Sequence, residues 1–378
     1  MDDRPRLKTA KPEVTDVLIK GDGPAALAAA IVLRQQGRQV TIVQRSSNID
    51  KIRAGESLSS QALIALKELG LADEFLLARH PPCYGNSSSW GNDKLSFFDF
   101  IQSPMGLGWY VHRRKFNQML QAKAMAMGTV FITSGRADGL DKENGTWHYH
   151  PRNGRDTPIE AKIIIDASGR NCWLSRRLGI NRIYDDKQVA ITMLFNSKPG
   201  ARSYHSLVEA VKDGWWYIAG FDEDKTACLF FTDLDLHKRT DLADTDYLNA
   251  KKAETSFVKH RVPQHLNDSL IAPELAYAGS SSLSQYTGEE WLAAGDAACA
   301  MDPLSSHGIA FALRSGIDAA TAANSFLEGN QNAISQYDEM LRTAVGLYHE
   351  QRVKIYQQEG RWAGGVYWER RHGAGRLL

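Results

Sequence analysis

The hydrophobic and polar positions near the start of the chain predict a strand, a helix and a second strand in close succession. The apolar run TDVLIK (15–20) is typical of a buried strand, and ALAAAIVLRQQG (26–37) has the composition of a helix that stops at Gly37. RQVTIVQ (38–44) then has the pattern of a second strand. The segment therefore predicts a βαβ unit, which is a common element of nucleotide-binding folds.

Further along, helical spacing returns in residues 57–78 and 114–127. The segments TVFITS (129–134) and TWHYHP (146–151), with an Asn144–Gly145 turn before the second, predict antiparallel strands. AKIIIDASG (161–169) has the pattern of a buried strand that ends at a glycine turn.

The pattern changes in residues 186–285, where short alternating segments predict an antiparallel sheet. These segments are QVAITMLF (188–195), WWYIAGF (215–221) and TACLFFTD (226–233). EWLAAGD (290–296) returns to a buried strand and turn, and helical patterns fill most of the rest of the chain. The two ends therefore predict one domain built from distant segments, with a sheet domain inserted between them.

Composition narrows the class of protein. The 378 residues carry a formal net charge of +1, which gives no general attraction for nucleic acid or an anionic membrane. No apolar run reaches the ~20 residues of a spanning helix, and the charged N-terminus has no secretion signal, so we expect a cytoplasmic protein. The four cysteines are widely spaced, which predicts buried reduced thiols and no metal site.

The turn GDGPAA (21–26) lies between the first strand and its helix and predicts a dinucleotide site. Gly21 permits a tight turn, and Gly23 lets the backbone approach a pyrophosphate at the positive end of the helix. Gln44 stands at the end of the second strand, where an acidic residue would be expected to bind the ribose hydroxyls. An amide can still bond a hydroxyl, but without the added strength of a charge, so adenosine binding is expected to be weaker.

Three further motifs make the chain resemble the superfamily of FAD-dependent monooxygenases and tryptophan halogenases. These are KIRAGESL (51–58), IIIDASGRNCWLSRRLG (163–179) and WLAAGDAACAMDPLSSHGIAFAL (291–313), whose order and separation also match. The resemblance spans most of the chain and implies FAD as the cofactor.

The same resemblance implies an α/β fold. It consists of a Rossmann-like FAD-binding domain of the glutathione-reductase/hydroxylase type, an inserted antiparallel-sheet substrate domain and a helical C-terminus. On the sequence we assign residues 14–60, 105–185 and 286–330 to the FAD-binding domain. Residues 61–104 and 186–285 are assigned to the substrate domain, and 331–378 to the C-terminal helices.

The resemblance also implies which residues bind FAD. Asp296 is expected to accept a hydrogen bond from a ribityl hydroxyl, and the Pro303–Gly308 loop to turn its N–H groups toward the flavin ring. Arg53 and Arg113 match arginines that lie near the cofactor in the family. The expected cofactor-binding residues are Gly21, Gly23, Pro24, Ala25, Gln44, Arg45, Arg53, Arg113, Asp166, Gly295, Asp296, Pro303, Ser306 and Gly308.

In this family reduced flavin and O2 form a C4a-hydroperoxide, which serves either hydroxylation or halogenation. Halogenation uses a lysine that lies shortly before a tryptophan, but the matching segment LLARHPPCYGNSSSW (76–90) contains no lysine. The halogenase pattern W-x-W-x-I-P is also altered, because Gly214 and Ala219 replace its first tryptophan and its proline. Both losses argue against halogenation and favour monooxygenation of an electron-rich aromatic or dehydrogenation.

One subgroup combines a halogenase-like body with the loss of that lysine. Its members are flavoprotein maturases that modify a tryptophan inside a partner oxidase or dehydrogenase on the way to a tryptophylquinone cofactor. The short chain and the altered motifs are similar to this group, so the expected substrate is a precursor oxidase. A free small aromatic remains the alternative substrate, for a hydroxylase or a halogenase.

Three residues are candidates for a direct part in the reaction. His307 lies in the loop before a helix, where its ring could act as an acid or base or could bond the loop backbone. Glu56 matches the family Gly-Glu pair. In DGWWYIAGF (213–221), alternation places Trp216 and Ile218 on one face of the strand, and Trp215 and Tyr217 on the other. The family alignment turns the Trp216 face toward the flavin pocket.

A third class of function is a flavoprotein chaperone that binds a partner without turnover, which the weak fingerprint at Gln44 would allow. The chain has no second dinucleotide motif, so a separate flavin reductase or an external reductant is a candidate electron source.

Overall fold

The structure of the protein is a computed structural model that describes residues 13–44, 55–100, 106–135, 138–151, 157–197, 204–222 and 224–373. Its first three elements are β1 (Glu13–Lys20), α1 (Pro24–Gln35) and β2 (Val40–Gln44), and β1 and β2 pair in parallel. The predicted βαβ unit is therefore confirmed. Val17, Ile19 and Ile42 are fully buried, as expected for strands covered on both faces.

Distant segments complete the sheet around this unit. β11 (Ile159–Asp166) pairs in parallel with β1, and β20 (Trp291–Ala293) pairs in parallel with β11. β8 (Val130–Thr133) lies parallel to β2 on the other side, and β19 (Thr287–Gly288) closes the β20 edge. The discontinuous domain predicted from the two ends of the chain is thus present as one sheet.

The Asn144–Gly145 turn joins a hairpin, β9 (Gly139–Glu143) and β10 (Thr146–His150), which extends from β11. β10 pairs antiparallel with β9 and with β11, and residues 129–134 contribute β8 to the parallel sheet instead. The turn was predicted correctly from its sequence. The strand before it, β9, was not, because the sequence pattern of a strand does not indicate which strand it pairs with.

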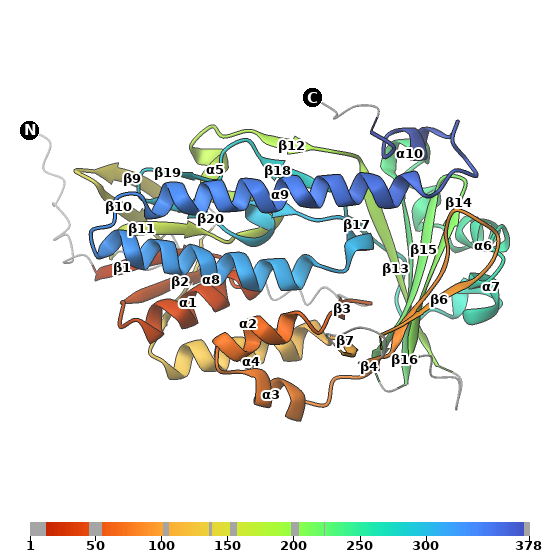
Figure 1. Cartoon of the computed structure of the whole chain (residues 1–378), viewed down its shortest axis with the longest axis horizontal. Helices are drawn as coiled ribbons and strands as arrows, with labels where there is room; N and C mark the ends of the chain where they lie inside the picture. Colours follow the sequence, from red (N-terminus) through yellow and green to blue (C-terminus); the bar gives the residue numbers. More distant parts are fainter. Residues whose placement is uncertain are drawn as a thin grey trace, which may run out of the picture.

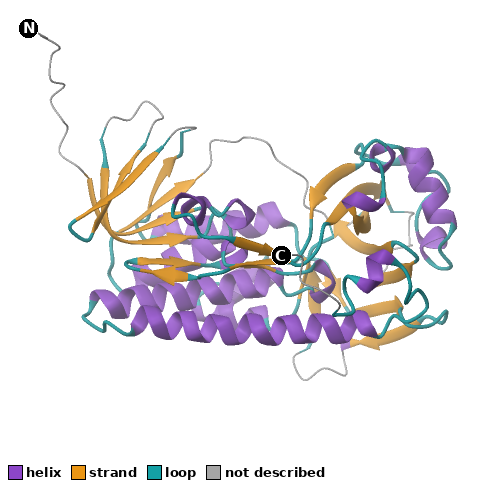
Figure 2. Ribbon diagram, turned by 90° about the horizontal axis from the view of Figure 1, so that it is seen from above, coloured by secondary structure: helices purple, strands orange, loops and turns teal. Residues whose placement is uncertain are grey.

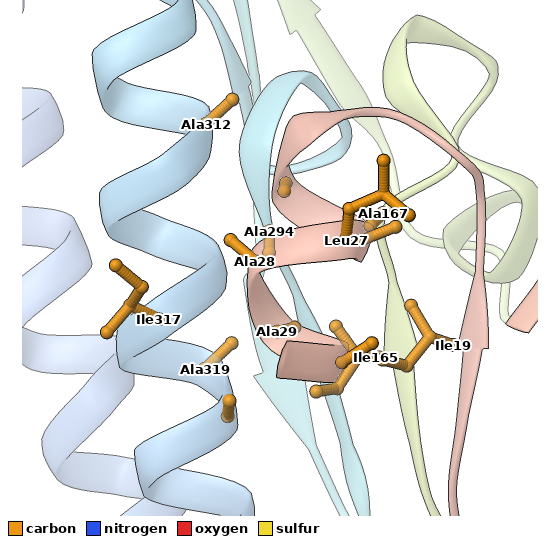
Figure 3. Close-up of a cluster of buried hydrophobic side chains, with 14 of the residues drawn as sticks. Ile19, Leu27, Ala28, Ala29, Ile165, Ala167, Ala294, Ala312, Ile317 and Ala319 are labelled. Atoms are coloured by element: carbon orange, nitrogen blue, oxygen red, sulfur yellow. The ribbon is translucent and has the colours of Figure 1, made fainter. Parts of the chain in front are cut away.

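Long helices cover the parallel sheet. α1 packs against α8 (Gly308–Leu327), and α4 (Arg113–Ala126) packs against α1. Figure 3 shows small side chains, including Ala28, Ala29 and Ala319, between α1, α8 and the sheet. Alanine lets these elements approach closely, because it fills little space between backbones. α9 (Ala333–Gln357) packs on α8 and runs toward the strands of the inserted region (Figure 1).

Two short helices, α2 (Ala62–Glu68) and α3 (Ala72–Leu77), follow the short strand β3 (Ser57–Leu58). Leu66 and Phe75 are fully buried in the same core as α1 and α8. These helices therefore lie with the nucleotide-binding half, whereas the sequence placed all of 61–104 with the inserted sheet. The reason is that their apolar residues face α8 and α4.

The inserted region forms a seven-stranded sheet in the order β17-β13-β16-β15-β14-β5-β6. Its strands are β5 (Gly85–Ser89), β6 (Ser96–Asp99), β13 (Gln188–Asn196), β14 (His205–Val211), β15 (Gly214–Asp222), β16 (Lys225–Asp233) and β17 (Glu274–Tyr277). Neighbouring strands are antiparallel except for β5 and β14. The alternating segments of 186–285 thus form the predicted antiparallel sheet, which stands at one end of the elongated molecule (Figure 2).

Smaller elements join the two halves. β7 (Gly108–Tyr110) pairs with β3 and with β4 (Pro82–Cys83), and β18 (Ser281–Leu283) pairs with β12 (Arg182–Tyr184) and β21 (Cys299–Ala300). α5 (Trp173–Arg177) follows β11, α6 (Thr245–Ala253) and α7 (Val258–Arg261) flank the sheet, and α10 (Val366–Glu369) lies near the C-terminus. Among the described residues, no helix is both long enough and apolar enough to cross a membrane.

Candidate active site

The glycine turn after β1 is built for close approach by a ligand. Gly21 has a φ of +128°, and a Cβ there would lie 2.1 Å from the carbonyl oxygen of Ala167, so the position requires glycine. A Cβ at Gly23 would meet nothing within 4 Å, so space is open in front of α1. Gly23 is the N-cap of α1 and makes no side-chain cap, and Pro24 follows at the first helical position. This arrangement fits a pyrophosphate at the positive end of the helix.

Tight contacts between glycine and alanine hold a second turn beside the first. This turn is the 3-10 helix η6 (Gly295–Ala297). A Cβ at Gly295, where φ is +60°, would lie 2.8 Å from the Cβ of Ala25, and one at Gly316 would lie 2.3 Å from the Ala25 carbonyl oxygen. Ala25 and Gly295 therefore bring α1, η6 and α8 together, which is a structural role in building the site.

The Asp296 side chain lies in η6 and is 41% exposed, with its carboxylate 3.8 Å from Arg170 Nε. An exposed carboxylate beside the glycine turn fits the expected acceptor for a ribityl hydroxyl. Gln44 is half-buried at the end of β2, and its backbone carbonyl oxygen accepts a hydrogen bond from Ser134 N at 2.7 Å. The predictions for Arg45 and Arg53 lie outside the described residues.

Asp166 holds the turn that follows β11. It is fully buried, and its two carboxylate oxygens accept hydrogen bonds from Ser168 N at 3.0 Å and from Leu174 N at 2.9 Å. Because both oxygens bond backbone N–H groups of the turn and of α5, Asp166 shapes the end of β11 that Gly21 touches. The expected contact of Asp166 with the cofactor stays a prediction.

Residues 302–308 form a loop, called here the 302–308 loop, that opens the 20-residue helix α8. Pro303–Ser305 form the 3-10 helix η7, and Asp302 caps it by accepting a hydrogen bond from Leu304 N at 2.9 Å. Ser306 has a φ of +53°, which turns the chain, and a Cβ at Gly308 would meet nothing within 4 Å. The loop therefore presents an open helix N-terminus, which favours negative charge nearby.

The structure brings the Gly-Glu segment to this loop. Ser57 Oγ donates a hydrogen bond to Ser306 Oγ at 3.2 Å. The neighbouring Glu56 forms an ion pair with Arg113 Nη1 at 3.0 Å, and Arg113 Nε also donates to Asn117 Oδ1 at 3.1 Å. Three predicted residues from distant segments thus lie around one site. Glu56 holds Arg113 in place, and His307, the residue after Ser306, is exposed.

The structure places Trp216 on the face of β15 that points away from the 302–308 loop. Its side chain is fully buried and stacks on Phe230, with ring centroids 4.8 Å apart, in a cluster that includes Val258 of α7. The other face of β15 carries Trp215, in a cluster against which Leu304 of the 302–308 loop packs. Alternation separates two faces but does not say which one meets the 302–308 loop, and here it is the Trp215 face.

Sequence reasoning also missed polar side chains behind the 302–308 loop. Asp302 Oδ2 accepts hydrogen bonds from Tyr356 Oη at 2.9 Å and from Arg352 Nε at 3.2 Å. Tyr348, Arg352 and Tyr356 stand at every fourth position of α9, which places them on one face of the helix. An arginine within the buried stripe of a helix was the available signal.

Burial shapes the chemistry of these groups. It raises the pKa of the Tyr356 phenol, and the nearby Asp302 carboxylate raises it further, so Tyr356 stays protonated and can donate. Burial lowers the pKa of Arg352, but Asp302 and Asp186 more than offset this effect, so the pKa is raised overall. The four cysteines are free and buried, as the sequence predicted, and the described residues contain no cluster of three or more His, Cys, Asp or Glu side chains placed to hold a metal.

Comparison with known proteins agrees with this geometry. The FAD binding domain family matches residues 14–347, so the chain belongs to that family and is an FAD-dependent oxidoreductase. It is 28% identical over 367 residues to "Putative FAD-dependent oxidoreductase LodB" of Marinomonas mediterranea, covering 95% of this chain and 97% of LodB. The expected cofactor, FAD, and the expected class of fold are confirmed.

Two further proteins are similar to this chain, one in sequence and one in fold. A 1H-pyrrole-2-carbonyl-[peptidyl-carrier protein] brominase of Pseudoalteromonas luteoviolacea is 26% identical over 327 residues, which cover 83% of this chain and 78% of the brominase. The solved structure of the peptidyl tryptophan dihydroxylase QhpG, essential for tryptophylquinone cofactor biogenesis, superposes with a TM-score of 0.78 at 23% identity. That match covers 98% of this chain and 80% of QhpG, and it supports the fold.

Proposed function

We propose that this protein is an FAD-dependent monooxygenase that oxygenates a tryptophan side chain of a partner protein during formation of a tryptophylquinone cofactor. The observation that carries the proposal is the lack of any lysine in residues 76–90, where a halogenase of this family would need one. The likeness to LodB over nearly the whole of both chains, and the QhpG fold, support the same choice.

The arrangement of the site supports oxygenation. Reduced FAD, when bound, supplies the electrons that activate O2, so one oxygen atom enters the indole and the other leaves as water. The N-terminus of α1 would bind the pyrophosphate, and that of α8 would stabilise negative charge on the reduced ring. Glu56 would orient Arg113 near the cofactor, and the exposed His307 is our candidate to move a proton during the reaction.

An exposed aromatic edge supports a protein as the substrate. β6 is the last strand of the inserted sheet, and Phe97 and Phe98 on it are 64% and 55% exposed. Large exposed aromatics on an unpaired strand edge are typical of surfaces that bind another chain. The strand register places Phe98 on the face of the sheet that also carries Tyr217 of β15. Phe98 pairs with Asn86 of β5, and Asn86 pairs with Ser206 of β14, the strand next to β15.

The proposal is tested with the protein loaded with FAD, a chemical reductant, O2 and the precursor of a tryptophylquinone oxidase. We expect a mass gain of oxygen on one tryptophan of the precursor, labelled when 18O2 is used, and little reaction with free tryptophan. A purified flavin reductase with NADH tests the electron source in parallel. Unchanged precursor in both arrangements would overturn the proposal.

Halogenation of a small or carrier-bound aromatic is the second candidate, because a brominase is among the relatives. The same assay with bromide separates the two reactions, since a halogenase would add bromine in place of oxygen. We also place the reaction in the cytoplasm, which the four free thiols support because reduced cysteines are typical of that compartment. Detection of the protein in a periplasmic fraction would contradict this location.

A further inference from the structure

The 302–308 loop is held from behind by one face of α9. Asp302 is 2% exposed, and its two carboxylate oxygens bind different parts of the chain. One oxygen caps η7 through Leu304 N, and the other receives Tyr356 Oη at 2.9 Å and Arg352 Nε at 3.2 Å. The Asp302 N–H donates to Tyr348 Oη at 2.7 Å. Backbone and side chain of the residue that begins the loop are therefore both fixed by α9.

α9 is itself anchored to the inserted sheet. Arg352 Nη2 forms an ion pair with Asp186, whose other oxygen accepts a hydrogen bond from Gln188 N, the first residue of β13, at 3.0 Å. All of these side chains are at least nine-tenths buried. The contacts therefore make a continuous path of polar groups from the inserted sheet, through α9, to the loop that opens α8.

Charge explains why this path matters for a flavin. An unscreened carboxylate close to the N-terminus of α8 would oppose the negative charge of a reduced ring. Arg352 supplies the compensating positive charge, and Tyr356 donates a hydrogen bond to the same carboxylate oxygen. Together they hold Asp302 in the geometry that caps η7 and reduce its effective negative charge.

We propose that Arg352 and Tyr356 are positioning residues for the cofactor: by holding Asp302 they fix the 302–308 loop and set the affinity and reduction potential of FAD. This inference rests on the proposed function only in placing the loop at the flavin. It does not depend on the substrate.

The test compares two buried tyrosines, of which only one donates its hydroxyl to Asp302. Tyr356 and Tyr367 are both buried and both hydrogen-bond Gln188 Oε1, at 3.5 Å and 2.6 Å, but only Tyr356 also donates to Asp302. We expect Tyr356→Phe to raise the Kd for FAD about tenfold and to lower the midpoint potential of the bound flavin, because Asp302 loses a donor. Tyr367→Phe should change the Kd by less than about twofold and leave the potential unchanged.

FAD affinity is measured by fluorescence titration of the apoprotein and potential by dye equilibration, with thermal unfolding of each variant as the check on folding. If Tyr356→Phe does not fold, Tyr348→Phe serves instead, since it removes the acceptor of the Asp302 N–H and should also weaken FAD binding. Equal effects of the tested variant and Tyr367→Phe on affinity and potential, or no effect of either, would overturn the inference. Failure to oxidise a tryptophan with the expected Tyr356→Phe result would instead overturn only the proposed function.

Discussion

The two faces of the inserted sheet are both aromatic, but they are closed in different ways. On the outer face Trp216 stacks on Phe230, and α6 and α7, which follow the sheet closely in sequence, supply apolar residues that cover them. On the inner face Trp215 stacks on Phe231 at 3.9 Å, and the covering residues come from the 302–308 loop and the C-terminal segment. The outer face is closed locally, and the inner face is closed by distant parts of the chain.

The chemical difference follows the same division. The inner face ends in Gln188 and Asp233. Arg371 donates to the two Asp233 carboxylate oxygens from Nη2 and Nη1, at 2.6 Å and 3.1 Å. Tyr367 donates to Gln188 Oε1 at 2.6 Å. A polar interface requires matched partners in fixed positions, whereas an apolar one requires mainly shape. The outer face should therefore contribute stability alone, whereas the inner face also packs on Tyr356, through which it should influence the cofactor site.

The largest expected effect is that of Trp216→Ala on stability. The ring is fully buried against Phe230, so its removal leaves a cavity and should lower the free energy of unfolding by about 3–5 kcal/mol. FAD affinity of the folded fraction should stay within about twofold, since Trp216 lies on the face away from the 302–308 loop. Urea unfolding of the apoprotein and FAD titration measure the two quantities. Trp216→Phe is the matched control, and a large loss of FAD affinity at unchanged stability would contradict the comparison.

Arg371→Met should have a somewhat smaller effect, about 3 kcal/mol, because it leaves the buried Asp233 without its bidentate partner. The expected loss lies at the lower end of the range for breaking a buried ion pair, because Arg370 Nη1 still binds Asp233 Oδ2 at 2.9 Å. Chemical unfolding checks the value. The double variant Asp233→Leu/Arg371→Met should recover much of the lost free energy of unfolding. A double variant that is less stable than Arg371→Met alone would argue against a charge effect.

The sequence predicted local structure and motif positions well, and relative orientation poorly. The βαβ unit, the Asn144–Gly145 hairpin turn and the alternating strands of 186–285 follow from spacing and turn chemistry, which act over a few residues. Strand alternation has a period of two and is symmetric between its faces, so it could not say whether Trp215 or Trp216 faces the loop. That choice depends on Leu304 and on the C-terminal segment, which lie far away in the chain.

The candidate site divides in the same way. Glu56, Arg113 and Ser306 could be named because each lies in a motif with a recognisable local pattern, and the structure brings them together. Arg352 was visible only as a charged residue in the apolar stripe of a helix, and its partner Asp302 is 50 residues earlier. Hydrogen bonds between positions so far apart leave no spacing that a single sequence can reveal.

The smallest expected effect concerns two thiols and sharpens the contrast between the faces. Cys228 on the outer face is fully buried, and burial raises its pKa to about 12. Burial also raises the pKa of Cys83, which packs with Ala219 and Tyr110, but hydrogen bonds from Tyr110 and from backbone groups offset part of that rise. The apolar environment of Cys228 therefore disfavours the thiolate more strongly.

The sign of the pH effect follows from these shifts. Above about pH 9 the unfolded chain loses a thiol proton that folded Cys228 retains, so unfolding becomes more favourable as pH rises, by up to about 1.4 kcal/mol per unit. Cys228→Ala should remove this part of the slope between pH 9 and 10.5, and Cys83→Ala should remove less, whatever each variant costs at neutral pH. Unfolding free energies measured across this range decide the matter. Ala219 lies on the inner face with Trp215, so Cys83 reports on that side of the sheet. A larger change of slope for Cys83→Ala would mean that the inner side excludes charge more strongly than the apolar outer face, which would reverse the comparison.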